Sequence, residues 1–262
     1  MSFAGQVAVV TGASSGIGWA LARALAVEGC KLGLVARRRE QLADLAAQIE
    51  KSGGIVAFAA ADIAEREQAI AAIGEIAERL GPVDLLLANA GVGAPTTVEP
   101  FNVADVEKMF RVNVLGVVYA IEAVLPAMLA RGRGHLAAVS SIAAYKGLPG
   151  ESGYTASKAA VNNYLEGLRI QLRGRNIAVT TICPGFVKTP MTDVNEFKMP
   201  FLLTADDAAR RIVRALRRRK KVFNFPWQMA LLMKLTAWLP DWVVARAMHQ
   251  YNENPPFPKA PL

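Results

Sequence analysis

Short apolar runs alternate with longer segments of helical periodicity along this chain, and this alternation restricts the fold more than any other feature of the sequence. Each strand-like run is followed by a helical pattern, so successive strands are expected to point the same way. The order predicts an α/β fold: a doubly wound (Rossmann), mostly parallel seven-stranded sheet with helices on both faces. Six of the strands can be placed, at Gln6 to Thr11, Lys31 to Ala36, Ile55 to Ala60, Asp84 to Asn89, His135 to Ser140 and Ile177 to Ile182.

The domain organisation is predicted to be simple, because the 262 residues contain no linker and no internal repeat. Residues 1–225 are expected to form a dinucleotide-binding and catalytic domain, and residues 226–262 an apolar, Trp-rich extension of the same domain. Within the first part, residues 186–203 form an apolar loop that Pro190 and Pro200 interrupt. We expect this loop to be a substrate lid, the alternative being that its apolar side chains fill the core. Helices are predicted at five places: after Gly18 as far as Ala26, and at Glu65 to Leu80, Val103 to Ala130, Ser152 to Arg173 and Asp206 to Arg218.

The turn after the first predicted strand has the composition of a phosphate-binding loop. It runs Thr-Gly-Ala-Ser-Ser-Gly-Ile-Gly from Thr11 to Gly18. Glycines at such positions allow a tight turn and a close approach of the backbone to a pyrophosphate, with the helix N-terminus facing the phosphates. A purely structural turn is the alternative. The residues predicted to bind the cofactor here are Gly12, Ser14, Ser15, Gly16, Ile17 and Gly18.

The end of the second predicted strand indicates which dinucleotide is bound. An acidic residue about 20 residues beyond the glycines holds a ribose 2′-hydroxyl, whereas an arginine there suits a 2′-phosphate. This chain has Ala36 followed by Arg37, Arg38 and Arg39. We therefore expect Arg37 and Arg38 to bind the cofactor, and NADP(H) to be preferred over NAD(H). The alternative, that these arginines only solvate the start of a helix, applies more to Arg38 and Arg39 than to Arg37.

A second candidate site, formed by polar side chains, is expected farther along the chain. Tyr154 and Lys158 lie one helical turn apart on the same face of a predicted helix. A cation close to a tyrosine lowers the pKa of its phenol, which is about 10 in water. Ser141 follows a predicted strand and is expected at the same edge of the sheet, with Ser140 as its rival. A Tyr-x-x-x-Lys pair also occurs by chance on amphipathic helices, so the pair alone indicates little.

Taken together, these residues resemble the single-domain branch of the short-chain dehydrogenase/reductase family over nearly the whole chain. Ala88 departs from the family pattern, because many relatives have Asn there. The motifs that carry the resemblance are Thr-Gly-x-x-x-Gly-x-Gly at 11 to 18, Asp62-Ile63, Asn89-Ala90-Gly91, Asn113, Ser141, Tyr154-x-x-x-Lys158, and Pro184-Gly185 with Thr189.

The resemblance implies a role for each matched residue. Tyr154 would be the general acid or base, and Ser141 would bind the substrate oxygen. Lys158 would lower the Tyr154 pKa and contact the nicotinamide ribose, while Asn113 would hold a water that links Lys158 to solvent. Contacts with the cofactor are implied for Asp62, Ile63, Asn89, Ala90, Gly91, Tyr154, Lys158, Pro184, Gly185, Val187 and Thr189.

The expected function is therefore an NADP(H)-dependent oxidoreductase that interconverts a small hydrophobic ketone or aldehyde and its alcohol. The alternative is a catalytically silent dinucleotide-binding regulatory or scaffold protein, which the four filled catalytic positions disfavour. Sugar epimerases and methyltransferases built on related sheets would leave the Ser, Tyr and Lys set unexplained. No metal site is expected, since His135 and His249 lack carboxylate or cysteine partners at ligand spacing.

The C-terminal part of the chain carries most of the net charge of +8. Eight of the residues from Arg210 to Lys221 are Lys or Arg, and a Trp- and Leu-rich segment follows. No nucleic-acid-binding motif accompanies them, so no nucleic acid is expected as a partner. We expect a homodimer or homotetramer, with the apolar segment docked on a sister subunit or on the core, the alternative being peripheral membrane contact through residues 210–248. Two cysteines without a disulfide pattern and the lack of a signal peptide favour the cytoplasm, or the inner face of a membrane.

Overall fold

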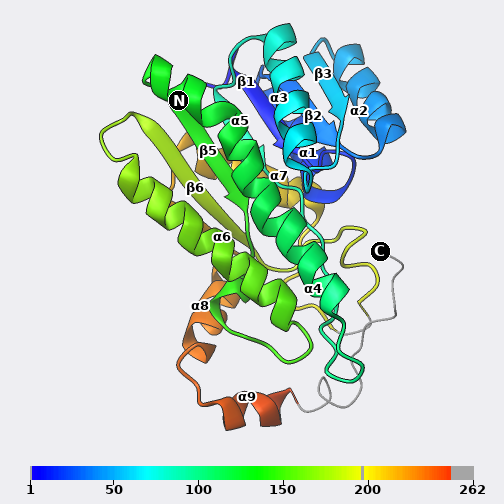
Figure 1. Ribbon diagram of the computed structural model, residues 1–262, viewed down its shortest axis with the longest axis vertical. Helices are drawn as coiled ribbons and strands as arrows, with labels where there is room; N and C mark the ends of the chain where they lie inside the picture. The colour runs from blue at the N-terminus through cyan, green and yellow to red at the C-terminus, as the bar shows by residue number, and fades with distance from the viewer. Residues whose placement is uncertain (1, 196–197, 249–262) are drawn as a thin grey trace.

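The computed structural model describes residues 2–195 and 198–248, and a parallel sheet runs through its centre (Figure 1). The strands are β1 (Val7–Thr11), β2 (Lys31–Ala36), β3 (Ile55–Ala60), β4 (Leu85–Ala88), β5 (Gly134–Val139), β6 (Ile177–Pro184) and β7 (Val222–Phe225). They pair in the order β3-β2-β1-β4-β5-β6-β7, and every pair is parallel. The predicted doubly wound sheet is confirmed, and β7 is the strand that the sequence analysis did not place.

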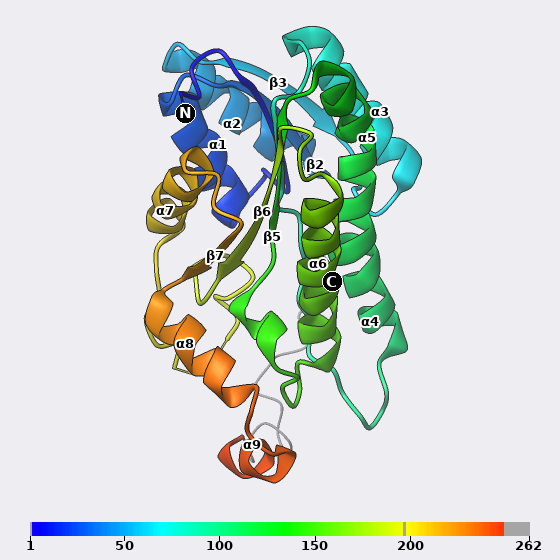
Figure 2. The same ribbon diagram turned by 90° about the vertical axis from the view of Figure 1, so that its left-hand side faces the viewer.

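Helices cover both faces of this sheet, as predicted (Figure 2). On one face, α1 (Gly16–Val27), α2 (Arg39–Lys51) and α7 (Ala205–Arg217) bury a cluster around Leu21, Leu45 and Ile212. On the other face lie α3 (Arg66–Leu80), α5 (Gly116–Arg131) and α6 (Ser152–Gln171). Because both faces are covered, the central strands are continuous apolar runs rather than alternating ones.

The predicted helix from Val103 to Ala130 is one helical segment with an irregular turn inside it. It consists of α4 (Val103–Phe110), a π-helical turn η1 (Arg111–Leu115) and α5. A π turn widens the helix by one residue and often occurs at functional sites. Asn113 lies in this turn, so the interruption changes the direction in which its side chain points. By length and composition this segment, Val103–Arg131, could cross a membrane, yet its apolar face packs in the core against α3 and the sheet.

The order of the strands in the sheet indicates at which edge a ligand would bind. Strand order reverses between β1 and β4, because β1 continues to β2 on one side while β4 and β5 lie on the other. Ligands of open α/β sheets bind at the carboxyl ends of the strands at this switch point. The glycine-rich turn follows β1 and the Asn89-Ala90-Gly91 segment follows β4, so both meet there.

The C-terminal extension continues beyond the same edge (Figures 1 and 2). It contains α8 (Trp227–Thr236) and α9 (Asp241–Ala247). One side of α8 packs against η2, a 3₁₀ helix at Ile142–Tyr145, through Met229 and Ala230. The other side is exposed and also apolar, with Trp227, Leu231, Leu232 and Leu235, followed by Trp238 and Trp242.

Candidate functional site

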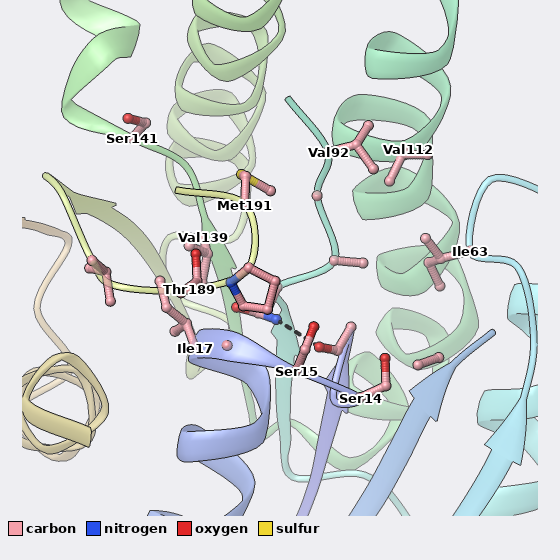
Figure 3. A pocket seen from close by; sticks show the side chains of 18 of the residues that line it. Ser14, Ser15, Ile17, Ile63, Val92, Val112, Val139, Ser141, Thr189 and Met191 are labelled. Atoms are coloured by element: carbon pink, nitrogen blue, oxygen red, sulfur yellow. Dashed lines mark hydrogen bonds between the residues drawn. The ribbon is translucent and has the colours of Figure 1, made fainter. Parts of the chain in front are cut away.

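A single cavity of about 360 Å³ at the carboxyl edge of the sheet collects nearly all of the predicted site residues. Figure 3 shows its walls, with Ser14 and Ser15 on the turn after β1, Ile63 on one side, Thr189 on the other, and Ser141 and Met191 farther along. This volume is typical of a small-molecule or cofactor site. The predicted residues that line it are Gly12, Ser14, Ser15, Gly16, Ile17, Arg37, Arg38, Asp62, Ile63, Asn89, Ala90, Gly91, Ser141, Tyr154, Lys158, Pro184, Gly185, Val187 and Thr189.

The glycines of the turn are required by close backbone packing. Gly12 has φ +67°, and a Cβ there would lie 2.7 Å from Ala90 Cα. Gly18 does not line the cavity, and a Cβ on it would lie 2.3 Å from the Gly12 carbonyl oxygen. The Thr11 hydroxyl accepts hydrogen bonds from the backbone N–H groups of Asn89 and Ala90, both at 3.1 Å. The turn is thereby held against the segment after β4, with the N-terminus of α1 facing the cavity.

Two arginines, Arg37 and Arg38, line the end of the cavity that is predicted to hold the adenosine, here called the adenosine end. Each has a different partner. Arg38 donates to the Ser14 hydroxyl from Nη2 at 2.9 Å and from Nε at 3.2 Å. Arg37 forms a longer ion pair with Asp62, 3.8 Å between Nη1 and Oδ2. The preference for Arg37 over Arg38 as the cofactor residue is therefore not reflected in the geometry. Both guanidinium groups flank the Ser14 side of the cavity, and Arg39 lies instead over the Phe58 ring.

The other end of the cavity, here called the catalytic end because the predicted catalytic residues lie there, is formed by α6 and the carboxyl end of β5. Lys158 Nζ donates to the Val139 carbonyl at 3.0 Å and lies 5.7 Å from the centre of the Tyr154 ring. The Ser140 hydroxyl donates to the Lys158 carbonyl at 2.9 Å, so it is used in holding α6. Ser141 Oγ accepts from the Ala143 N–H at 3.1 Å and caps η2, while interacting with the Tyr154 side chain. This arrangement favours Ser141 over Ser140 as the residue that reaches a substrate.

Burial dominates the pKa values of this pair. It raises the pKa of Tyr154 to about 12, against the effect of the hydrogen bond with Ser141, and the Glu151 charge adds to the rise. Burial also lowers the pKa of Lys158 to about 8, because the ammonium loses hydration. In the protein's own groups burial outweighs any effect of Lys158 on the Tyr154 pKa, and the role of Lys158 in lowering that pKa stays a prediction. At neutral pH the phenol keeps its proton, and Lys158 is still charged.

Asn113 lies behind the cavity rather than on its wall. Its amide donates to the Val92 carbonyl at 2.9 Å and to the Ser157 hydroxyl at 3.0 Å, and its Oδ1 accepts from the Val92 N–H at 2.8 Å. A Cβ on Gly91 would lie 3.2 Å from Lys158 Nζ and 3.3 Å from Asn113 Oδ1. Asn113 therefore fixes the segment after β4 against α6, close to the Lys158 ammonium.

Several wall residues were not predicted individually. Val92 and Val112, the latter in the π turn itself, line the cavity (Figure 3). Met191 lies near Tyr154, since a Cβ on Gly93 would contact both Met191 and Tyr154. Met191 belongs to the expected lid, whose residues 196 and 197 lie outside the described part of the chain. The apolar side chain of Met191, in a loop after a strand, was the sequence feature that could have predicted its place in the cavity wall. The other unpredicted wall residues are Val35, Ala36, Ala61, Val139, Ser140, Pro190 and Thr192.

The described residues contain no group of three or more His, Cys, Asp or Glu side chains that could hold a metal ion. Nε2 of buried His135 lies 2.8 Å from Thr180 Oγ1, and burial lowers the pKa of His135 to about 4. His135 is thus a neutral core residue. His249 lies outside the described residues.

Comparison with known proteins identifies what the chain resembles. The family model for short chain dehydrogenases matches residues 6–199. An uncharacterized oxidoreductase of Myxococcus xanthus is 38% identical over 236 residues, covering 90% of this chain and 93% of that protein. A short chain dehydrogenase/reductase from Burkholderia phymatum in complex with NAD has a TM-score of 0.83 at 27% identity, with 100% of both chains covered. Actinorhodin polyketide ketoreductase with NADPH has a TM-score of 0.79 at 26% identity, covering 86% of this chain and 97% of that one.

Proposed function

This chain belongs to the short-chain dehydrogenase/reductase family of oxidoreductases, and from that premise we propose that it reduces a hydrophobic ketone or aldehyde with NADPH. One observation carries the proposal. Tyr154, Lys158 and Ser141 meet at one end of a cavity whose other end is formed by a glycine-rich turn and two arginines. A dinucleotide that extends along this cavity would have its reactive end beside the phenol.

The cavity fits a dinucleotide by the shape of its backbone. Gly12 and Gly16 both have positive φ, and a side chain on Gly16 would contact Thr189 across the turn. When bound, NADPH supplies a hydride to the carbonyl carbon. The chain would supply the proton: the Tyr154 hydroxyl, which is protonated at neutral pH, donates it to the carbonyl oxygen, and Ser141 hydrogen-bonds to the same oxygen. The Lys158 ammonium stabilises the phenolate that remains.

We propose that Arg37 and Arg38 make NADPH the preferred cofactor. Ala36 leaves no carboxylate for a ribose 2′-hydroxyl, and the two guanidinium groups with the Ser14 hydroxyl surround the place where a 2′-phosphate would lie. Arginine binds phosphate oxygens in a bidentate way, which supports this assignment. The structural neighbours include complexes with both NAD and NADPH, so the arginines are the distinguishing feature.

We propose an apolar substrate because of the wall beside Tyr154. Met191 lies near the Tyr154 ring, and Pro190 and Val92 also line the cavity. The segment 186–203, which carries Met191, is the proposed lid. Residues 1–225 then form the cofactor-binding and catalytic domain. The ketoreductase among the structural neighbours supports a carbonyl substrate. The silent scaffold alternative is disfavoured, because a protein that only bound a dinucleotide would have no need for a buried lysine beside a tyrosine.

A panel of hydrophobic ketones, aldehydes and alcohols tests the proposal by following the absorbance of NADPH or NADP. Tyr154→Phe keeps the ring and removes the proton, and it should lower kcat about 100- to 10,000-fold on any responding substrate. NADPH binding, measured by fluorescence, should change little. Full turnover by this variant would refute the role of Tyr154.

We also propose that a second copy of the chain covers the outer face of α8, as a homodimer or homotetramer. Large apolar side chains that lie together on a surface mark an interaction site, and Trp227, Leu231 and Leu235 form an exposed stripe at helical spacing on α8. Along the chain, β7 lies between the basic run and α8.

Peripheral membrane contact through residues 210–248 is the alternative to this assembly. Size-exclusion chromatography with light scattering should show an assembly for the parent protein and a monomer for Leu231→Ser. A monomeric parent that floats with anionic vesicles would instead support membrane contact. A cytoplasmic location is proposed because Cys30 and Cys183 are both free and buried, as expected in a reducing compartment.

A further inference from the structure

The 3₁₀ turn η2, which begins directly after Ser141, is held from behind by the C-terminal part of the chain. Ile142 of η2 is buried in a small cluster with Cys183, Met229 and Ala230. Met229 and Ala230 belong to α8, and Cys183 is in β6 next to Pro184 and Gly185. The turn that carries Ser141, the end of β6 and α8 therefore share one small core.

Tyr145, the last residue of η2, makes the polar contact in this arrangement. Its hydroxyl donates to Asn224 Oδ1 of β7 at 2.8 Å, and it lies 4.0 Å from Cys183 Sγ. Lys234 Nζ of α8 lies 5.4 Å from the centre of the same ring. Burial raises the pKa of Tyr145 to about 12, so the hydroxyl remains a donor at every pH at which the protein would be assayed.

The next residue adds a second connection to the extension. Lys146 Nζ donates to the Leu239 carbonyl at 3.3 Å and pairs with Asp241 Oδ1 at 3.4 Å. The Lys146 side chain is only 17% exposed, although Asp241 is fully exposed. The end of the loop that leads into α9 is thereby connected to the residue that follows η2.

Gly185 shows how tightly these elements meet. Its N–H donates to the Phe225 carbonyl at 2.7 Å, and a Cβ on it would lie 3.2 Å from both Ile142 Cδ1 and Pro226 Cδ. A displacement of η2 would therefore move Ser141 and disturb the proposed nicotinamide end of the cavity at the same time.

We propose that Tyr145 is a positioning residue for Ser141, and that β7 acts on the reaction through the Tyr145 to Asn224 hydrogen bond. The inference rests on the proposed role of Ser141. Tyr145 does not line the cavity and touches no reacting atom. Its hydroxyl fixes η2 relative to β7, and the position of η2 determines where the Ser141 hydroxyl points.

The test compares Tyr145→Phe and Asn224→Ala in the full-length protein on a responding substrate. Tyr145→Phe retains the ring, its packing and its contact with Lys234, and removes only the hydrogen bond. Each variant should lower kcat about three- to tenfold, the size expected for one hydrogen bond, without changing the Kd for NADPH. The double variant should be no slower than the slower single variant, because both remove the same contact.

Tyr164→Phe is the matched control, since Tyr164 packs against the core cluster on the α3, α5 and α6 side of the sheet. It should leave kcat within twofold of the parent. A merely structural role for Tyr145 would lower the melting temperature and leave kcat unchanged well below it, and that result would overturn the inference. Additive losses in the Tyr145→Phe and Asn224→Ala double variant would do the same.

Ser141→Ala separates this inference from the proposed function. Loss of turnover in Ser141→Ala together with normal turnover in Tyr145→Phe would overturn only the positioning role. Full turnover in Ser141→Ala would overturn the role of Ser141 in the proposed function, and the inference with it. In the Ser141→Ala background, Tyr145→Phe should change the remaining kcat by less than about twofold, as expected for residues that act as one unit.

Discussion

The two ends of the cavity hold their charged groups in opposite ways. At the adenosine end the Arg37 side chain is 60% exposed. At the catalytic end Lys158 is 4% exposed and Asn113 is 1% exposed, and in the described part of the chain no buried side-chain nitrogen or oxygen lacks a hydrogen-bond partner. Exposed ion pairs contribute little to stability, whereas buried polar networks are strong and costly to break. On the proposed function, we therefore expect the exposed end to select the cofactor and the buried end to determine the rate.

The largest expected effect separates the two ends directly. Lys158→Met removes the buried ammonium and should lower kcat about 100- to 1000-fold, the size typical of a lost electrostatic contact to the transition state. Arg38→Met removes a cation at the exposed end and should raise the KM for NADPH while leaving kcat within about twofold. Steady-state kinetics of both variants checks this, and equal losses of kcat would contradict the division between the ends.

The glycine-rich turn joins the two ends, and its effect should come from backbone shape rather than charge. Gly12→Ala places a Cβ 2.7 Å from Ala90 Cα at positive φ, so the free energy of unfolding should fall by about 2–4 kcal/mol. Gly74→Ala in α3 is the control, because a Cβ there meets nothing within 4 Å. This control should be stabilised by up to about 1 kcal/mol. Urea unfolding without cofactor measures both, and equal stability of the two variants would rule out the packing argument.

A charge reversal at the exposed end should have a smaller, selective effect. Arg37→Asp should weaken NADPH binding about tenfold and leave NADH binding unchanged or tighter, because a carboxylate repels a 2′-phosphate and can accept from a 2′-hydroxyl. Arg39→Asp is the matched control, since Arg39 does not line this cavity. Cofactor titration at low and at high salt tests it, and the effect should shrink as salt increases. Equal binding of NADPH and NADH by the parent protein would remove the assignment of Arg37.

The smallest effect expected is a pH dependence confined to the buried end. Lys158 has a pKa lowered to about 8, so its ammonium is present below that pH and is lost as the pH rises through it. Without this charge the Tyr154 phenolate is less stable, and kcat for reduction should fall severalfold between about pH 7 and 9. The KM for NADPH should not follow this change. A flat kcat profile over this interval would show that Lys158 does not act through its charge.

Local sequence patterns were sufficient wherever the structure depends on neighbouring residues. The strands Lys31–Ala36 and Ile55–Ala60 were predicted to the residue, because each is a short apolar run between turns, although the second lies at the edge of the sheet. The seventh strand, Val222–Phe225, was not placed, because it is short and mostly half-exposed. The π turn at Asn113 was also missed, because nothing in its composition distinguishes it from the α-helix on either side.

The sequence by itself determined the parallel sheet, the family resemblance and the residues that gather at the carboxyl edge, because all of these follow from the order and spacing of residues along the chain. Only the tertiary structure decided that Ser140 is used in holding α6 while Ser141 remains available, and that Arg38 contacts Ser14. It also decided the pKa values of Tyr154 and Lys158. Burial and hydrogen bonds between distant segments depend on how the strands are ordered in space, and sequence spacing does not record that order.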